Sequence, residues 1–495
     1  MKISTINIIA IFVCLLFCSC KKFLEEKPYS FQTPSSYFQN KSDAYTALMG
    51  AYNGLGPNYY ARHMYFISTL CSDESISLNG ETGEKQLDKL TFSATLSNLL
   101  ALWRAMFTSI MRDNNVIAGV PTVDMDDSLK QVYIGEARFL RALTYFDAVR
   151  LWGRVPLMKG VVETLEDAYV EQSSVKEVYD FIIEDLKYAI NVLPNKNANG
   201  RAGKGSAMAI LAKVYLTKAT SEAADRDEDY RQCIMYCDEV LGLPEFHLMP
   251  DFQKAVGAAN EFNPESVFEW QGDRELNAEF SSMAHFALPS GVYGIVPENA
   301  TGESRFGAER TYYNKFNAKD YRKQSTFITS GFDINGNPLN WLQWPFPNPS
   351  PAKKLINETS NTRSGFAFSS NYLIIRLADV YLMKAEAINE LDGPTPEAYT
   401  MINTIRARAR NGNGTNVSTY PADLKNLDQA SFREAVLDER QFELSYEGHR
   451  WFDLVRTHTL LEKVSAAKER NYIFPIPNTE ILLSKGRLTQ NKEWQ

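Results

Sequence analysis

YEGHRWFDLVR, residues 446–456, carries a histidine, two acids, two arginines and three aromatic side chains within eleven positions. It is the most chemically loaded stretch of the chain. His449 stands close to Glu447 and Asp453, and a histidine beside carboxylates is the composition of a proton relay. The stretch is therefore either an active site or the interior of a fold.

The apolar positions around this stretch favour the interior of a fold. They fit helical faces, at Phe442, Tyr446, Phe452 and Val455. Gly448 permits a break between two helices, and Arg450 and Asp453 are three residues apart, which suits a local ion pair. We therefore expect His449→Ala to cost stability and to leave ligand specificity unchanged.

A helical hairpin is predicted upstream of this stretch. Residues 371–391 place apolar side chains on one helical face, at Ile374, Leu377, Ala378, Tyr381, Ala385 and Ile388. The turn at residues 392–394 ends this helix. Thr395 is a natural N-cap with Pro396 at the first helical position, and the second helix runs to the break at residues 411–412.

Similar amphipathic segments recur earlier, at residues 134–151, 174–193 and 206–219. Ser174 and Glu177 form a capping box, and so do Ser431 and Glu434 before the helix that leads into the opening stretch. Small residues beside an aromatic at one-turn spacing are typical of tetratricopeptide-like stacks, as in Ala207, Leu211, Tyr215 and Ala219. No strict 34-residue period is visible, so the pattern indicates architecture only.

The texture of the sequence changes between residues 261 and 372. Proline, glycine and asparagine cluster in GFDINGNPLNWLQWPFPNPSP, residues 331–351, and helical periodicity fades. Long irregular segments in compact proteins are usually functional or disordered, and the many Trp and Phe residues argue against disorder. We expect these aromatic side chains to pack or to bind.

Composition excludes two broad classes. The 495 residues are 44% hydrophobic and 12% aromatic, which is ample for a large core and excludes a disordered protein. The net charge is -8, from 60 acidic and 52 basic residues mixed along the chain. No basic face is offered to a nucleic-acid backbone, so nucleic acid is not an expected partner.

The N-terminus reads as an export signal. An apolar run at residues 6–17 is too short for a comfortable membrane span and precedes small residues and cysteines. The segment resembles the lipobox of bacterial lipoproteins, and Ser19 supplies the small residue before Cys20. We expect residues 1–19 to be removed, Cys20 to be lipidated, and the mature chain to be anchored to a membrane.

Several motifs for catalysis or metal binding are incomplete or absent. The glycine-rich residues 199–206 lack the spacing of a phosphate loop, and neither HExxH nor GxSxG occurs. Cys233 and Cys237 are one helical turn apart, which suits buried structural thiols better than a disulfide or a zinc site. DINGN, residues 333–337, could offer oxygens to calcium but lacks EF-hand spacing, so we expect a plain turn, no metal and no cofactor.

Five blocks, in order, resemble the SusD/RagB family of surface lipoproteins that Bacteroidetes use to capture nutrients. They are GEARFLRALTYFDAVRLWGRVPL, SAMAILAKVYLTKA, IIRLADVYLMKAEAINEL, ERQFELSYEGHRWFDLVR and YIFPIPNTEILLSKGRLTQN. CKKFLEEKP also looks like the start of the family's mature chains. Together these blocks cover nearly the full length.

The resemblance implies a mainly α fold: a tetratricopeptide-like helical hairpin scaffold with an irregular, loop-rich, ligand-facing region. The expected divisions are a signal peptide (1–19), a lipid anchor and tether (20–30), an N-terminal helical region (31–260), the irregular insert (261–372) and a C-terminal helical region (373–495).

The resemblance also implies a function without bond chemistry. Family members sit on a SusC-like TonB-dependent outer-membrane transporter, face the cell surface and bind an oligosaccharide, or in one branch a peptide. A surface glycosidase is the alternative from another class, since counting acids cannot exclude a pair of catalytic carboxylates.

Sugars need aromatic platforms for their C–H faces and polar partners for their hydroxyl groups. Two stretches offer both. Residues 70–92 contain Asp73, Asn79 and Glu81, and the insert contains Tyr293, Arg305, Trp341 and Trp344. The early stretch has no tryptophan, unlike starch-binding members, so we expect the insert to do most of the binding.

Overall fold

The structure is a computed structural model that describes residues 37–197, 200–256, 260–272, 282–295, 301–356, 371–415 and 417–495. The predicted signal peptide, Cys20 and the tether lie outside the described residues. Within those ranges, no helix is both long enough and apolar enough to span a membrane.

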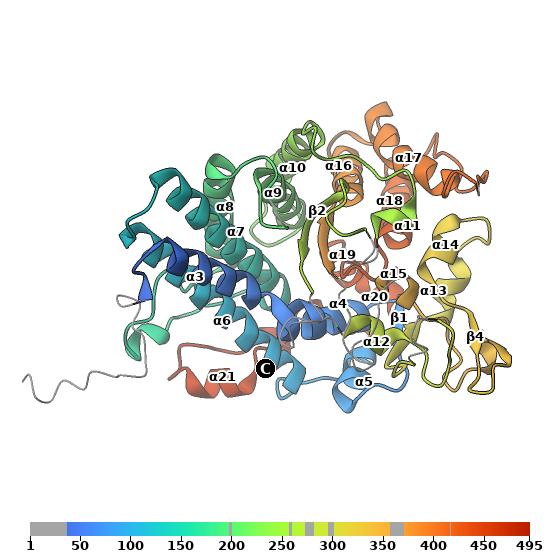
Figure 1. Ribbon diagram of the computed structural model, residues 1–495, viewed down its shortest axis with the longest axis horizontal. Coiled ribbons are helices and arrows are strands. Elements are labelled where there is room, and N and C mark those ends of the chain that lie inside the picture. Colours follow the sequence, from blue (N-terminus) through green and yellow to red (C-terminus); the bar gives the residue numbers. More distant parts are fainter. Residues whose placement is uncertain are drawn as a thin grey trace, which may run out of the picture.

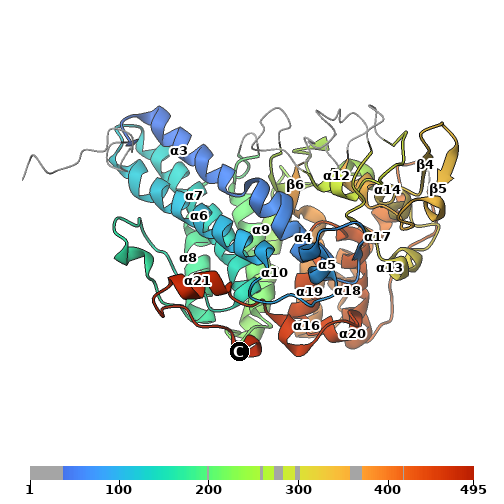
Figure 2. The same ribbon diagram turned by 90° about the horizontal axis from the view of Figure 1, so that it is seen from below.

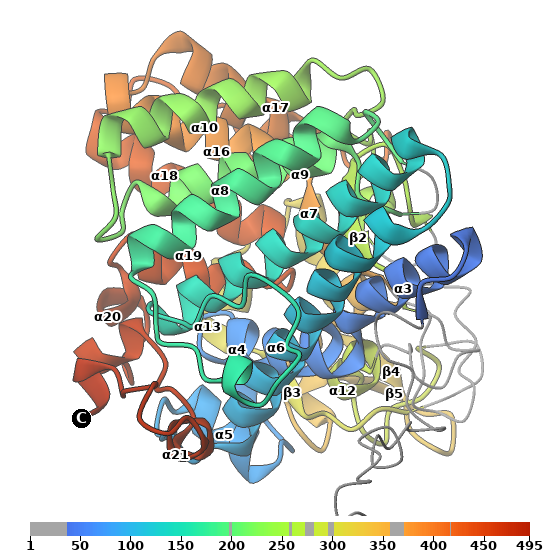
Figure 3. The same ribbon diagram turned by 90° about the vertical axis from the view of Figure 1, so that its left-hand side faces the viewer.

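The scaffold is a row of long helices, each packed on the next (Figures 1 and 3). Its first half comprises α3 (Lys41–Gly54), α6 (Ser97–Gly119), α7 (Asp127–Trp152), α8 (Val175–Val192), α9 (Lys204–Lys218) and α10 (Arg226–Leu241). Its second half comprises α16 (Leu377–Asp392), α17 (Pro396–Asn411) and α18 (Gln429–Leu444). The mainly α, tetratricopeptide-like expectation is confirmed.

Short helices complete this scaffold. Between α3 and α6 lie the π-helix η2 (Gly56–Met64), α4 (Tyr65–Leu70) and α5 (Thr82–Asp88). Two 3-10 turns flank α7, η3 (Val120–Thr122) and η4 (Glu166–Ala168). After α18 come α19 (Arg450–Arg456), α20 (Leu460–Lys463), η7 (Glu469–Tyr472), α21 (Asn478–Leu483) and η8 (Lys492–Trp494).

Two predicted helix starts are confirmed. Ser174 caps α8, with its hydroxyl accepting from the Glu177 N–H and the Glu177 carboxylate accepting from the Ser174 N–H. Thr395 caps α17, and Pro396 occupies its first position.

Two other predicted starts are wrong. The N-cap of α18 is Asp428, whose carboxylate accepts from the Ser431 N–H at 2.7 Å, so Ser431 lies inside the helix. Ile374 belongs to a strand, β6 (Tyr372–Arg376), and α16 begins only at Leu377. The short run of β-branched and aromatic residues before Leu377 fits a strand as well as a helix, and pairing decides between them.

That pairing closes the insert at its base. Strand β2 (Ser266–Trp270) pairs antiparallel with β6, from Ser266 opposite Arg376 to Trp270 opposite Tyr372. Helix α10 precedes the insert in the sequence and α16 follows it, yet the two pack directly on each other. The row of scaffold helices is therefore continuous across the insert. The insert therefore projects from the row through a two-stranded ribbon.

The described part of the insert consists of short elements (Figure 2). Its helices are α12 (Met283–Ala287), α13 (Arg310–Lys315), α14 (Tyr321–Thr326), η6 (Trp341–Gln343) and α15 (Ala352–Leu355); α11 (Phe252–Ala255) precedes it. Its strands are β3 (Phe306–Ala308), β4 (Ser330–Phe332) and β5 (Pro338–Asn340), and β3 pairs with β1 (Ser75–Ser77) of the early stretch.

The core is aromatic and large. Trp103 meets Trp152 edge to face at 4.9 Å, and Trp451 of the opening stretch packs on Phe474 at 4.8 Å. Cys233 and Cys237 are buried free thiols, as predicted, and Cys71 is another.

Residues 446–456 form the junction of α18 and α19. Gly448 has φ +79°, and a Cβ at this position would lie 1.9 Å from the Tyr372 hydroxyl, so the predicted break needs glycine. Tyr446 lies in the turn with φ 60°, not on a helical face, and its hydroxyl donates to the Glu74 carbonyl at 2.8 Å.

His449 is buried beside a cation. Its Nδ1 lies 2.8 Å from the Lys213 ammonium, which also donates to Asp379 at 3.0 Å. Burial and then the Lys213 charge lower the pKa of His449 to about 3. A neutral, enclosed imidazole that accepts from lysine is part of the scaffold.

The predicted local pair between Arg450 and Asp453 is wrong. Arg450 binds Asp73 with two hydrogen bonds of 2.7 and 2.8 Å, 377 residues away in the sequence. Asp453 instead accepts from Arg440 at 2.8 Å and from Arg456 at 3.0 Å. Both side chains form ion pairs with residues on other parts of the fold instead of the expected pair within the helix.

Candidate ligand-binding site

The fold brings together the two stretches that the sequence singled out. Strands β1 and β3 pair antiparallel, with Ser75 opposite Ala308 and Ser77 opposite Phe306. Beyond the strands, the Asn79 N–H donates to the Ser304 carbonyl at 2.9 Å. The early stretch and the insert therefore form one continuous surface.

Arg305 is a buried side chain of the insert that forms ion pairs with the early stretch. It is 6% exposed and makes ion pairs with Glu84 at 2.7 Å and Glu81 at 2.5 Å. Burial raises the pKa of Glu84, although the Arg305 charge opposes this. Because its donors are held by carboxylates, Arg305 positions the surface and is not a free ligand contact, which corrects its predicted role.

Asp73 is also committed to the protein. Besides Arg450, it accepts from the Gln441 amide at 3.1 Å. Burial disfavours its ionised form, but the hydrogen bonds and charge of Arg450 outweigh burial and hold the pKa of Asp73 below its usual range. In this structure Asp73 ties the early stretch to α19, and its contact with a ligand stays a prediction.

Asn79 and Glu81 are the exposed polar groups of this surface. The Asn79 amide donates to the Glu303 carbonyl at 3.2 Å, and Glu81 reaches from Arg305 towards Arg62 at 3.8 Å. Both keep side-chain atoms open to solvent.

The β4–β5 hairpin is tied by its turn. Asp333 accepts from the Asn335 and Asn337 N–H groups and from the Asn337 amide, each at 2.8 Å. DINGN is therefore a turn whose carboxylate is occupied by its own backbone, as predicted. The described residues contain no group of three or more His, Cys, Asp or Glu side chains arranged to hold a metal.

Tyr293 borders this hairpin. Its N–H donates to the Phe332 carbonyl at 2.8 Å and its carbonyl accepts in return at 3.0 Å. Tyr293 is half-buried, whereas Phe332 is 45% exposed at the edge of β4. The apolar exposure continues in Ile334 at 79% and Leu342 at 62%.

Trp341 lies at the base of the hairpin and is half-buried, packed against the edge of the main hydrophobic cluster. Tyr313 meets its ring edge to face at 6.1 Å, and the Arg310 guanidinium lies over it at 5.3 Å. We name the set of Tyr293, Tyr313, Phe332 and Trp341 the aromatic hairpin.

Trp344 has a different environment although it is only three residues away. It is 4% exposed and belongs to the main hydrophobic cluster. A sugar needs an open ring face, so Trp344 cannot serve as a platform in this structure and its predicted role is corrected to packing.

Sequence reasoning missed Arg310, Tyr313 and Phe332. RTYYNK, residues 310–315, carries two tyrosines and an arginine in the insert, and that composition could have pointed to them. Their meeting with Trp341 depends on the path of the chain between α13 and β5, which no local pattern specifies.

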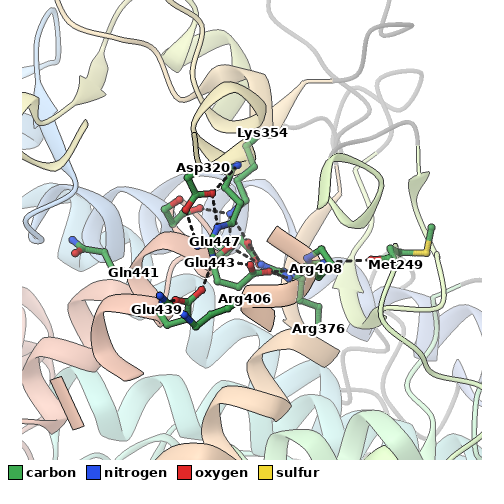
Figure 4. A network of polar contacts seen from close by, with 12 residues as sticks. Met249, Asp320, Lys354, Arg376, Arg406, Arg408, Glu439, Gln441, Glu443 and Glu447 are labelled. Carbon is green, nitrogen blue, oxygen red and sulfur yellow. Dashed lines mark hydrogen bonds and ion pairs between the residues drawn. The ribbon is translucent and has the colours of Figure 1, made fainter. Parts of the chain in front are cut away.

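A buried ion-pair network holds the insert to the scaffold (Figure 4). Arg376 of β6 pairs with Glu265, Glu443 and Glu447, each at 2.7 Å. Arg322 of the insert reaches Glu439 at 2.6 Å and Glu443 at 3.2 Å. The carboxylate of Glu443 thus links the insert, the ribbon and α18.

The network is balanced. Its five cations are Arg322, Lys354, Arg376, Arg406 and Arg408, and its five carboxylates are Glu265, Asp320, Glu439, Glu443 and Glu447. Burial opposes ionisation of Glu443, yet the surrounding guanidinium groups hold its pKa well below the usual range. The insert is therefore fixed by charge as well as by apolar packing.

Fold and site define a class: a helical-repeat scaffold that carries an insert with aromatic side chains at its surface. Residues 219–471 match the model of the SusD family, and residues 22–216 match a model described as "Starch-binding associating with outer membrane". The chain belongs to the SusD family.

Relatives extend over nearly the whole chain. "SusD-like protein P25" of Formosa agariphila is 28% identical over 97% of this chain and 94% of its own. The solved structure of a SusD homolog from Bacteroides thetaiotaomicron has a TM-score of 0.79 at 24% identity, covering 93% of this chain and 98% of that one. A laminarin-binding SusD-like protein has a TM-score of 0.76 at 25% identity, covering 92% and 100%.

Proposed function

We propose that this protein is a non-catalytic surface lipoprotein that binds an oligosaccharide and delivers it to a SusC-like TonB-dependent transporter of the outer membrane. The observation that carries the proposal is the aromatic hairpin, in which Phe332 is exposed and Tyr293, Tyr313 and Trp341 are half-buried, on a SusD-family scaffold. Rings bury the C–H faces of a sugar, and amide, acid and guanidinium groups satisfy its hydroxyls.

The comparisons support the ligand class and the location. One relative of similar fold and nearly full overlap is named for laminarin binding, and the family model for residues 22–216 is described by starch binding and the outer membrane. Lipidation of Cys20 would supply the anchor, with the protein facing the cell surface.

Three residues have the leading roles in this proposal. Trp341 offers the platform, because its ring is only half-buried and is held by Tyr313 and Arg310. Asn79 and Glu81 offer polar contacts on the adjoining surface. Arg305 and the buried network keep that surface in place before ligand arrives, which lowers the entropy cost of binding.

A peptide is the second candidate. Phe332, Ile334 and Leu342 expose apolar side chains that would accept the apolar residues of a peptide as readily as a sugar face. A surface glycosidase is the third and would need two carboxylates flanking the scissile bond. Release of reducing sugar that one Glu→Gln change stops would establish the third and refute the proposal.

Isothermal titration against a panel of oligosaccharides and peptides tests the ligand class. We expect binding to at least one glycan and weakening by roughly tenfold or more in Trp341→Ala, which corresponds to about 1.4 kcal/mol. Trp344→Phe is the matched control, because it keeps a buried aromatic and should bind as the wild type does. Binding to peptides alone would replace the glycan proposal with the peptide one.

A further inference from the structure

A second concave site lies away from the insert. It has a volume of about 610 Å³ and is bordered by the ends of α7, α9 and α19, the start of α8 and residues 489–495. Figure 2 shows the C-terminus on the opposite side of the molecule from α12 and the β4–β5 hairpin. A cavity of this size suits a small organic ligand.

The cavity walls are already fixed. Residues 489–495 form one wall, held by the Gln172 side chain, which accepts from the Thr489 N–H at 2.8 Å and from its hydroxyl at 3.0 Å. The Asn491 amide donates to the Trp152 carbonyl at 3.1 Å and to the Phe474 carbonyl at 2.9 Å. These hydrogen bonds keep the cavity open without a ligand.

One tyrosine in the wall has a free hydroxyl within the described residues. Tyr179 is 2% exposed and lines the cavity, and its hydroxyl makes no hydrogen bond to any residue that the structure describes. The hydroxyl oxygen is not fully enclosed, and a hydroxyl or carbonyl of a molecule bound in the cavity would give it a partner. This is the observation that points to a ligand.

The charges around the cavity balance. Arg154 and Lys492 face Glu222 and Glu493, and none of the four forms an ion pair within the described ranges. The other two lining arginines are paired outside the cavity lining, Arg150 with Asp147 and Arg456 with Glu386. A balanced rim favours a neutral ligand over a polyanion or a polycation.

The other side chains that line the cavity include hydroxyl, amide and aromatic groups. Tyr472 is half-exposed, with its hydroxyl donating to the His458 carbonyl at 3.1 Å, so its ring is held in place. Hydroxyl and amide groups surround it, from Thr217, Thr220, Ser221, Gln172 and Asn491. Rings with many neutral donors and acceptors match a polyhydroxylated ring.

We infer that this cavity is a second carbohydrate site, which holds a single neutral pyranose unit against Tyr472 with a hydroxyl on Tyr179. Its lining shares no residue with the aromatic hairpin, so a pyranose unit bound there would leave the hairpin free. The inference does not depend on the proposed function, because a different set of residues carries it.

The test is calorimetric titration and crystal soaking with methyl pyranosides of the gluco, galacto, manno, xylo and N-acetylglucosamine types. Three cavity variants are compared with the wild type: Tyr179→Phe, Arg154→Ala and Tyr472→Ala. Arg154 is exposed and unpaired within the described residues, so its loss leaves folding intact, and Tyr179→Phe keeps the ring. Trp341→Ala reports on the aromatic hairpin.

We expect at least one glycoside to bind in the cavity. Tyr179→Phe and Arg154→Ala should each weaken it about fivefold and Tyr472→Ala more than about tenfold, whereas Trp341→Ala should not change it. Absence of binding by every glycoside, equal binding by the cavity variants, or loss on Trp341→Ala would each overturn the inference. If Trp341→Ala loses oligosaccharide binding while no glycoside binds in the cavity, the proposed function stands and the second site fails.

Discussion

At the scale of single residues, His449 shows how burial determines the protonation state of a side chain. Its neighbours in the sequence suggest a proton relay, but its imidazole is enclosed and accepts from Lys213. A histidine whose folded pKa is about 3 stays neutral where an unfolded one, with a pKa near 6.5, takes up a proton. Its contribution to stability is therefore complete above about pH 6.5 and is lost as the pH falls towards 3.

We predict a pH-dependent effect of His449→Gln. Between about pH 7.5 and pH 5, the free energy of unfolding of the wild type should fall by roughly 2 kcal/mol more than that of the variant, since only the wild type gains this proton on unfolding. Urea unfolding at the two pH values measures the difference. An equal fall in the free energy of unfolding of the two proteins between these pH values would show that His449 titrates normally.

Trp341 and Trp344 mark the limit of residue-level prediction. Both lie in the same aperiodic, aromatic segment, so the sequence offers the same argument for each. The fold separates them, leaving Trp341 only half-buried and placing Trp344 in the core. The composition of the sequence singled out Arg305 and Asp73 as candidate ligand contacts. Their partners in the structure are far away in the sequence, and these contacts make both of them positioning residues.

At the scale of elements, the junction of α18 and α19 depends on one glycine. We predict that Gly448→Ala lowers the free energy of unfolding by about 3 kcal/mol or more, because the positive φ and the approach of Tyr372 both exclude a Cβ. Thermal and urea unfolding measure this. Gly336→Ala, at a positive φ with open space, is the control and should cost only about 1 kcal/mol.

A Gly448→Ala protein as stable as the wild type would show that the junction relaxes freely. In that case the turn at residues 446–449 would not fix the direction of α19, and the Arg450 pair with Asp73 would have to do so alone.

Helices were predictable as elements, whereas their boundaries and pairings were not. The apolar face of α16 is buried as its spacing indicated, at Leu377, Ala378, Ala385 and Ile388. Its start was misplaced because residues 372–376 pair with β2, which lies more than 100 positions earlier. Local capping rules likewise favoured Ser431 over Asp428, since both side chains can cap a helix.

At the scale of the whole molecule, the buried network fixes the insert on the scaffold. We predict that Glu443→Gln lowers the free energy of unfolding by roughly 3–5 kcal/mol, because it leaves Arg322, Arg376 and Arg408 with an uncompensated buried charge. Glu171→Gln is the matched control: its pair with Arg487 is exposed and is worth about 1 kcal/mol or less.

Equal stability of Glu443→Gln and Glu171→Gln would mean that the insert is held by apolar packing alone. No sequence pattern could have indicated this network, because its members come from residues 265–447 and meet only in the folded chain. The class of fold was predictable from ordered local blocks, but the placement of the insert was not.

The central claim is that the aromatic hairpin, and Trp341 above all, captures the ligand. A crystal structure of the protein with the glycan that titration identifies tests this most directly. We predict a sugar ring against Trp341, with hydroxyl groups within hydrogen-bonding distance of the Asn79 and Glu81 surface. A well-ordered glycan that leaves Trp341 and the rest of the aromatic hairpin untouched would contradict the claim.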